Sequence, residues 1–203
     1  MDVGLRHPLL IGALIASALL PCGVRAQEMA TPGPFPQAPG PTACVVEARA
    51  AADVLAVLDT APATPAYATP DAVAARGAAA DAASSAAVKA TLLQVFACAN
   101  AGDPLRFASL YTDPFLRDFF GGVPQADLVA FLGMPPQPLP VEQQRIIRGL
   151  GDVELLPDCR ARVVIILDEP DDPRTEEPDT VILRQVDGRW LVDEIHEDAG
   201  SAP

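Results

Sequence analysis

The apolar residues of this chain change their spacing once, near the proline-broken segment 135–140. Before that segment they recur at helical intervals, most clearly over 85–101, where Val88, Leu92 and Phe96 lie on one stripe. After it, β-branched residues gather in short runs typical of strands. Helices in one block followed by strands in another predict an α+β fold. We therefore expect N-terminal helices packed on a curved antiparallel sheet of about four strands.

Local signals mark where the helices begin and end. Asn100-Ala101-Gly102 ends the first firm helix, since glycine accepts the left-handed cap conformation. Asp103-Pro104 is a helix start, and Thr112-Asp113-Pro114 repeats it, with Asp113 as the expected cap. These signals predict three further helices, over 104–111, 115–120 and 124–132.

The strands are bounded by turn signals. Asp187-Gly188 lies between two β-rich runs, which is typical of a tight hairpin. Gly149 and Gly151 indicate a bulge or bend in the first strand region. The expected strand regions are 145–156, 162–167, 180–186 and 189–196, with an acidic loop over 168–179.

The first 26 residues predict export. Arg6 precedes an uncharged apolar run, and Val24-Arg25-Ala26 offers a cleavage site, so the mature chain would begin near Gln27 and be secreted or extracytoplasmic. An uncleaved anchor and a lipid on Cys22 are the alternatives. No later apolar stretch is expected to reach membrane-spanning length.

The predicted organisation is a signal peptide (1–26), a Pro-rich disordered lead-in (27–43), a short helical segment (44–59, helical over 46–58), a linker (60–71), a compact domain (72–198) and a tail (199–203).

Charge and cysteine content narrow the chemistry. The whole chain carries −13 and the mature chain near −14, which disfavours binding to nucleic acid or anionic lipid. Removal of the signal leaves Cys44, Cys98 and Cys159, which suggest one disulfide and one remaining thiol. The number of cysteines does not indicate which two of them form the disulfide. A Cys44–Cys98 bridge is our hypothesis, because it would staple the N-terminal segment onto the firm helix.

Two patterns in fixed order resemble a known superfamily. A helix ends in Ala99-Asn100-Ala101-Gly102-Asp103, and the set of strands closes with the segment that begins Asp187-Gly188-Arg189-Trp190. Over residues 85–198 this resembles the nuclear transport factor 2-like superfamily, which includes ketosteroid isomerases and polyketide cyclases. The resemblance implies a cone-shaped fold with a pocket between helices and sheet, and homodimers formed through the sheet are common in the superfamily.

The enzymes of this superfamily place acid–base groups in that pocket. The corresponding catalytic candidates here are Asp113, Glu194 and His196, none of which the sequence assigns. Simpler roles compete, because Asp113 suits a helix cap and His196 a solvent-exposed strand end. Strict alternation would place Trp190, Glu194 and His196 on one face of the last strand. The candidates for lining the pocket, each also suited to a core, are Phe96, Tyr111, Phe115 and Trp190.

The sequence predicts an exported, non-enzymatic module that binds a small apolar ligand or another protein. The alternative is an isomerase, cyclase or dehydratase acting on a small hydrophobic substrate. A third possibility is a structural domain of the cell envelope. We expect no metal and no cofactor, because the mature chain has one histidine and lacks zinc spacing, a calcium-loop glycine, a phosphate loop and a nucleophile elbow.

Overall fold

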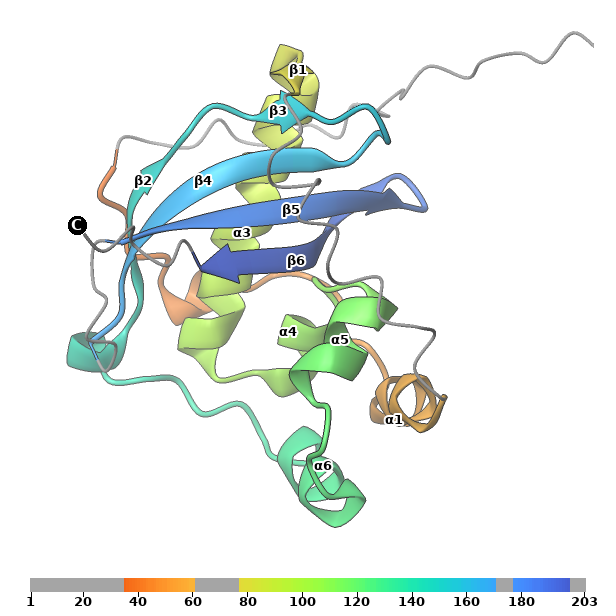
Figure 1. Cartoon of the computed structure of the whole chain (residues 1–203). Helices are drawn as coiled ribbons and strands as arrows, with labels where there is room; N and C mark the ends of the chain where they lie inside the picture. The colour runs from red at the N-terminus through yellow and green to blue at the C-terminus, as the bar shows by residue number, and fades with distance from the viewer. Residues whose placement is uncertain (1–34, 61–76, 171–176, 198–203) are drawn as a thin grey trace, which may run out of the picture.

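The computed structural model describes residues 35–60, 77–170 and 177–197. Within these ranges the fold is α+β, with five α-helices and an open antiparallel sheet of six strands (Figure 1). The helices are α1 (Ala51–Asp59), α3 (Ala82–Ala101), α4 (Pro104–Ala108), α5 (Asp113–Phe119) and α6 (Gln125–Leu132). The strands are β1 (Ala78–Ala79), β2 (Ile146–Leu150), β3 (Glu154–Leu155), β4 (Ala161–Asp168), β5 (Pro178–Val186) and β6 (Arg189–Glu197). Two short 3-10 helices, η1 (Pro41–Ala43) and η2 (Val141–Gln143), complete the described elements.

Helix α3 is the axis of the core and crosses behind the sheet in Figure 1. Its first turn is capped by Asp81, whose carboxylate accepts hydrogen bonds from the amides of Ala83 and Ser84. It ends at Gly102, which has a φ of 58°. The firm helix predicted over 85–101 is therefore confirmed, although it begins three residues earlier.

By length and composition alone, α3 is also apolar enough to cross a membrane, in contrast to our expectation for the residues after the signal. Its apolar side chains are largely covered by the rest of the protein, since Val88, Leu92 and Cys98 are each no more than 1 % exposed. The same hydropathy is expected for the central helix of a core.

The sheet has the order β1-β3-β4-β5-β6, and β2 pairs with the other half of β4. The four longer strands occupy the predicted regions, and the two-residue strands β1 and β3 add to the expected four. A register shift between Ile147 and Gly149 is the bulge that the glycines indicated. Asp187 and Gly188 have φ of 50° and 79°, so the predicted tight hairpin between β5 and β6 is confirmed.

The described part of the lead-in, residues 35–43, is not the disordered segment that its composition predicted. Gln37 and Ile147 exchange two backbone hydrogen bonds of 2.8 Å. The buried amide of Asn100 donates to the carbonyl oxygens of Pro39 and Arg145, at 3.0 and 3.1 Å. Partners far along the chain thus hold this segment. The predicted signal peptide, residues 27–34, most of the linker and the tail lie outside the described residues.

The helix predicted over 46–58 forms only from residue 51 onward. A hydrogen-bonded connection to α3 keeps the preceding residues non-helical. The Gln94 side chain accepts from the amide of Val45 and donates to the carbonyl of Ala43. The amide of Arg49 donates to the carbonyl of Leu105 instead of entering a helical turn.

Cys44 and Cys98 form a disulfide, which confirms the hypothesis of a staple between the N-terminal segment and α3. Both residues are buried. No cysteine in the described ranges is a free thiol. The counting argument was therefore wrong for Cys159, which was expected to remain a thiol and is disulfide-bonded. A buried disulfide suits an oxidising, extracytoplasmic environment.

Candidate ligand-binding site

Tyr111 lies where the helical layer meets the sheet. It forms an isolated parallel bridge with Val192 of β6. The amide of Thr112 donates to the carbonyl of Val192, whose own amide donates to the carbonyl of Leu110, each at 2.9 Å. The short helices α4 and α5 on either side leave only a few extended residues between them. That break in the helices lets the backbone at Tyr111 bond to the sheet edge and fixes where its side chain points.

A cavity of about 310 Å³ lies between α3, the aromatic residues of α4 and α5, and the inner face of the sheet. The residues that line it are Leu92, Val95, Phe96, Ala99, Phe107, Tyr111, Phe119, Arg145, Ile165, Leu167, Glu169, Glu177, Asp179, Val181, Val192, Ile195 and Glu197. Twelve of these seventeen are aliphatic or aromatic, so the body of the cavity is suited to an apolar molecule.

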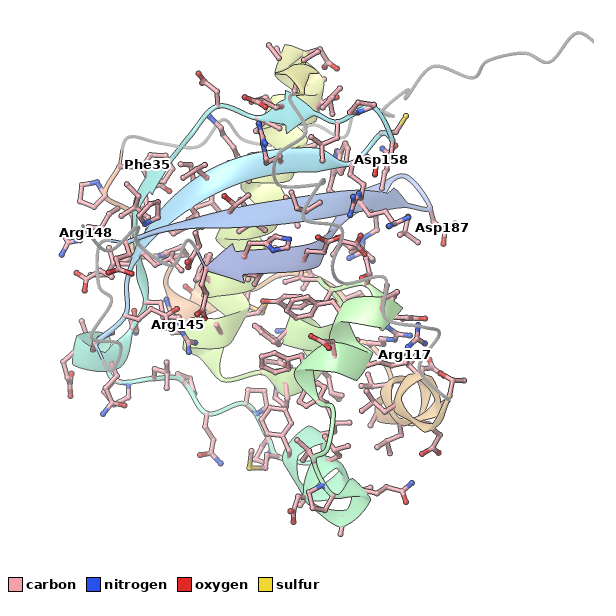
Figure 2. The ribbon with its side chains drawn as sticks, in the orientation of Figure 1. Phe35, Arg117, Arg145, Arg148, Asp158 and Asp187 are labelled. Carbon is pink, nitrogen blue, oxygen red and sulfur yellow. A yellow bond between two sulfur atoms is a disulfide. The ribbon has the colours of Figure 1, made fainter. Side chains whose placement is uncertain are left out.

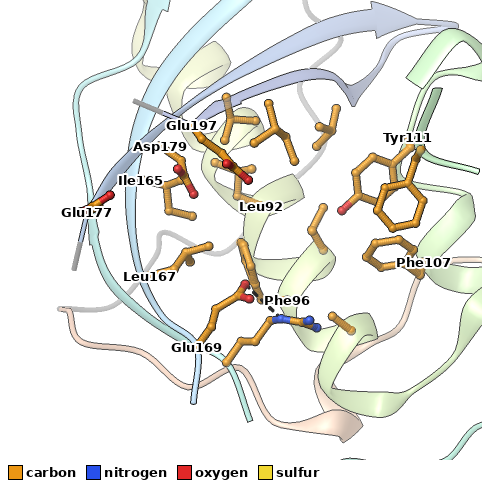
Figure 3. Close-up of a pocket in the computed structure, with 17 residues that line it drawn as sticks. Leu92, Phe96, Phe107, Tyr111, Ile165, Leu167, Glu169, Glu177, Asp179 and Glu197 are labelled. Carbon is orange, nitrogen blue, oxygen red and sulfur yellow. Dashed lines mark hydrogen bonds and ion pairs between the residues drawn. The ribbon is translucent and has the colours of Figure 1, made fainter. Parts of the chain in front are cut away.

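The acidic lining residues lie at the ends of β4, β5 and β6, and Arg145 immediately precedes β2. We call Glu169, Glu177, Asp179 and Glu197 the acidic rim. Asp179 and Glu197 are directly opposite each other in the β5–β6 register, and Figure 3 shows their carboxylates side by side. The guanidinium of Arg145 pairs with Glu169 at 3.0 Å. Among the described lining residues the rim therefore carries four carboxylates against one cation.

The hydroxyl of Tyr111 points into the cavity from the helical side, opposite the sheet (Figure 3). The residue is 4 % exposed. Burial, together with the charge of Glu169, raises the pKa of Tyr111 well above that of a free phenol, and Arg145 acts in the opposite direction. The phenol therefore stays protonated at physiological pH and serves the cavity as a neutral hydrogen-bonding group.

Six aromatic rings continue from the cavity towards α6. Tyr111 contacts Phe107 and stacks on Phe115, with ring centroids 4.5 and 4.6 Å apart. Phe119 continues the stack from Phe115 and is 55 % exposed. The other two rings are Phe120 and Phe131. These contacts hold Tyr111 in place and leave an aromatic side chain at the mouth of the cavity.

The strict alternation predicted for β6 is wrong, because the strand carries a bulge. Ile182 pairs with Glu194 and Leu183 with Val192, so Asp193 is an extra residue in the register. Beyond the bulge the faces exchange. Ile195 and Glu197 line the cavity together with Val192, whereas strict alternation would have placed Glu194 and His196 on the face of Val192.

Glu194 and His196 belong to a separate polar network. The Nε2 of His196 lies 2.8 Å from Glu194 Oε2, and Arg160 binds the other oxygen of Glu194. Burial acts to lower the pKa of Arg160, but its bonds with Asp158 and Glu194 outweigh that effect and raise it. The carboxylate of Asp193 accepts from Thr112 at 2.8 Å and from Arg184 at 3.0 and 3.1 Å. This network holds the bulge and satisfies its buried charges.

Asp113 lies in a different hollow, a polar groove of about 640 Å³ between α5 and the β5–β6 hairpin. Its carboxylate pairs with Arg49 at 2.7 Å. The predicted capping role belongs instead to Thr112, whose hydroxyl accepts from the amide of Phe115. The three catalytic candidates therefore do not meet at one site.

Of the four residues proposed to line the pocket, Phe96 and Tyr111 line the cavity. Phe115 supports Tyr111 from behind, and Trp190 is buried outside the lining residues. Sequence reasoning missed Arg145 and the acidic rim. Asp179 and Val181 are two residues apart on β5, a spacing that places both side chains on one face of the strand. The bulge in β6 interrupts the same two-residue spacing, so the sequence did not indicate that Glu197 shares that face.

Figure 2 shows Arg145 and Arg148 at the end of the sheet opposite Asp158 and Asp187. The cavity rim and the tip of the β5–β6 hairpin are thus at opposite ends of the same strands. Across residues 35–60, 77–170 and 177–197, no group of three or more His, Cys, Asp or Glu side chains is arranged so that it could hold a metal ion.

The chain shows no match to a known family model, to a curated protein or to a solved structure. The superfamily resemblance therefore rests on the residue patterns alone.

Proposed function

We propose that the chain is an exported, non-enzymatic binding domain that holds a small, largely apolar molecule in the cavity beside Tyr111. The observation that carries this proposal is the cavity itself, which is about 310 Å³ in volume and has a predominantly aliphatic and aromatic lining. A cavity of this kind gains affinity from burying apolar ligand surface.

We also propose membership of the nuclear transport factor 2-like superfamily and export by residues 1–26. Support for the first is the order of helices then antiparallel strands, with α3 packed across the sheet. Support for the second is the apolar N-terminal run, together with a buried disulfide of the type found in oxidising compartments.

Fluorescence titration with N-phenyl-1-naphthylamine, a neutral apolar dye, tests the binding proposal. We expect saturable, one-to-one enhancement with the mature chain. Ile195→Trp should abolish it by filling the cavity, because Ile195 is a lining residue on β6. Val164→Trp is the matched control, since Val164 is 40 % exposed and is not a lining residue. Equal binding by both variants, or no saturable binding by the unsubstituted chain, would refute the proposal.

A second candidate function is acid–base catalysis on a small hydrophobic substrate. The observation that favours it is that the protonated phenol of Tyr111 and several carboxylates line the same cavity. A carboxylate of Asp179 or Glu197 would remove a proton next to a carbonyl, while Tyr111 donates a hydrogen bond to its oxygen. Exchange of the α-protons of cyclohexanone for solvent deuterium, followed by NMR, tests this activity. Catalysis should fall in Tyr111→Phe and in the double variant Asp179→Asn/Glu197→Gln, and exchange at the uncatalysed rate would rule it out.

A further inference from the structure

The hydroxyl of Tyr111 is a buried polar group without a hydrogen-bond partner. The residue is 4 % exposed, and its hydroxyl is aimed into the cavity from the helical side (Figure 3). In the parts of the chain that the structure describes, no hydrogen bond reaches this oxygen. Buried polar groups in folded proteins normally have at least one partner, and a donor left unpaired is destabilising. A molecule that enters the cavity and pairs with this hydroxyl therefore gains affinity.

Neighbouring residues hold Tyr111 in this orientation. Its ring lies 4.5 Å from that of Phe107 and stacks on that of Phe115, with centroids 4.6 Å apart. Its backbone forms the isolated bridge with Val192 of β6. The ring cannot turn towards another part of the protein without breaking these contacts. A partner for the hydroxyl has to come from a molecule inside the cavity.

The phenol is suited to donate a hydrogen bond to that molecule. Burial raises the pKa of Tyr111, so the hydroxyl keeps its proton at physiological pH. One lone pair of a phenol oxygen is delocalised into the ring, which makes the group a better donor than acceptor. The lining residues in direct contact with Tyr111 are Phe107 and Val192, both apolar. Beside such side chains an uncharged acceptor atom costs far less to desolvate than an ion.

The dimensions and lining of the cavity limit the body of the ligand. Its volume of about 310 Å³ is near the lower end of the range of about 300–1,000 Å³ that is typical of small-molecule sites. Aromatic side chains on its walls, among them Phe96, Phe107 and Phe119, favour contact with a flat ring. A body of one or two fused rings suits this space.

From these observations we propose that the cavity binds a small, uncharged molecule whose largely apolar body carries a hydrogen-bond acceptor atom, and that this atom accepts the O–H group of Tyr111. This inference rests on the proposed binding function and specifies its ligand class. The nitrogen of an unprotonated heteroaromatic ring and a carbonyl oxygen both provide the required acceptor. Such an atom can replace water at the hydroxyl and keep the hydrogen bond, whereas a hydrocarbon of the same shape leaves the hydroxyl unpaired.

Isoquinoline and naphthalene are a matched pair of probes, because they differ only in one ring nitrogen that replaces a C–H group. In mildly alkaline buffer isoquinoline is uncharged. Competition against N-phenyl-1-naphthylamine, followed by fluorescence, gives the affinity of each probe for the mature chain and for Tyr111→Phe. The substitution should weaken isoquinoline about fivefold, the net contribution of one hydrogen bond, and leave naphthalene within about twofold. Comparison of one probe between two proteins cancels the difference in hydration between the probes.

Thr91→Val is the matched control for removal of a hydroxyl. The Thr91 hydroxyl lies between α3 and β6, where it donates to the carbonyl oxygens of Ala87 and Trp190, and Thr91 does not line the cavity. This variant should keep the affinities of the unsubstituted chain for both probes. Melting temperatures verify that each variant is folded.

The nitrogen resonance of ¹⁵N-labelled isoquinoline reports the hydrogen bond directly, since its chemical shift changes when the nitrogen accepts a proton donor. Bound to the unsubstituted chain or to Thr91→Val, the probe should show the shift of a hydrogen-bonded ring nitrogen. Bound to Tyr111→Phe, it should show the shift found in a hydrocarbon solvent. A role of Tyr111 in packing alone would not produce this difference.

The outcomes distinguish this inference from the proposed function beneath it. If Tyr111→Phe affects both probes equally, if the nitrogen shift is the same in both proteins, or if neither probe displaces a bound dye, the acceptor class is refuted while the apolar binding site stands. If N-phenyl-1-naphthylamine itself fails to bind, both proposals are refuted. Loss of both probes in Ile195→Trp, with retention in Val164→Trp, assigns the contact to this cavity.

Discussion

The hydroxyl of Thr112 donates a 2.8 Å hydrogen bond to the buried carboxylate of Asp193, the extra residue at the β6 bulge. The same hydroxyl accepts a hydrogen bond from the amide of Phe115 in the first turn of α5. One side chain thus joins the start of a helix to the irregular point of the last strand. Tyr111, immediately before it, owes its orientation to this junction.

Replacement of Thr112 by valine should destabilise the fold by about 1–3 kcal/mol. Valine keeps the shape of the side chain but removes both the helix cap and one partner of a buried carboxylate. Urea unfolding measures the difference. Thr60→Val is the matched control, because Thr60 is exposed at the end of α1, and its effect should stay within about 0.5 kcal/mol. Equal effects of the two substitutions would contradict the role assigned to Thr112.

Loss of the Cys44–Cys98 disulfide should lower the free energy of unfolding by about 4 kcal/mol. The bond spans 54 residues, and releasing that loop restores conformational entropy to the unfolded chain. The variant Cys44→Ala/Cys98→Ala, unfolded in urea without reductant, measures this loss. Val45→Ala is the control, since Val45 is the adjacent residue and is 74 % exposed. A loss below about 1 kcal/mol would show that the bridge does not stabilise the attachment of the N-terminal segment.

Three glycine-to-alanine substitutions should form a graded series. Gly102 has a φ of 58°, and a Cβ there would overlap the carbonyl oxygen of Gln137. Gly122 has a φ of 80° but open space around it, and Gly40 has open space with ordinary extended backbone. We expect Gly102→Ala to cost more than about 2 kcal/mol, Gly122→Ala about 1 kcal/mol and Gly40→Ala nothing measurable. Thermal unfolding gives the order, and a Gly122→Ala effect as large as that of Gly102→Ala would contradict the close packing of residue 137.

The cap of α3 should make stability depend on pH in the acid range. Hydrogen bonds from the side chain and amide of Ser84 hold the pKa of Asp81 below its usual value of 3.8. A depressed folded-state pKa means that the ionised cap contributes its full stability above pH about 4, and that this contribution is lost as pH falls through the lowered value. Asp81→Asn retains an oxygen for capping but does not titrate.

The melting temperature of the unsubstituted chain should therefore exceed that of Asp81→Asn by a constant amount at neutral pH. That difference should shrink below pH about 4. Circular dichroism melts across the acid range provide the measurement. A difference that is unchanged down to pH about 2, or that grows as pH falls, would contradict the charge-dependent cap.

Much of the secondary structure could be predicted because its causes are local. Asp81 was not foreseen as a cap, but the stripe through Val88 and Leu92, the glycine stop at residue 102 and the Asp187-Gly188 turn act within a few residues. The non-helical path of residues 46–50 could not be predicted, since it depends on Gln94 and on a disulfide to residue 98. Pairing partners of that kind come together only after folding.

By itself, the sequence determined the α+β order, the glycine stop at the end of α3 and the hairpin, because backbone preference and side-chain spacing operate over short distances. Only the tertiary structure decided which side chains meet in the cavity. The bulge at Asp193 exchanges the faces of β6, so Ile195 and Glu197 replace Glu194 and His196 at the site. Strand side chains alternate with a period of two, and one extra residue therefore reverses every orientation beyond it. That single register shift, stabilised by Thr112 and Arg184, determines which carboxylates face Tyr111.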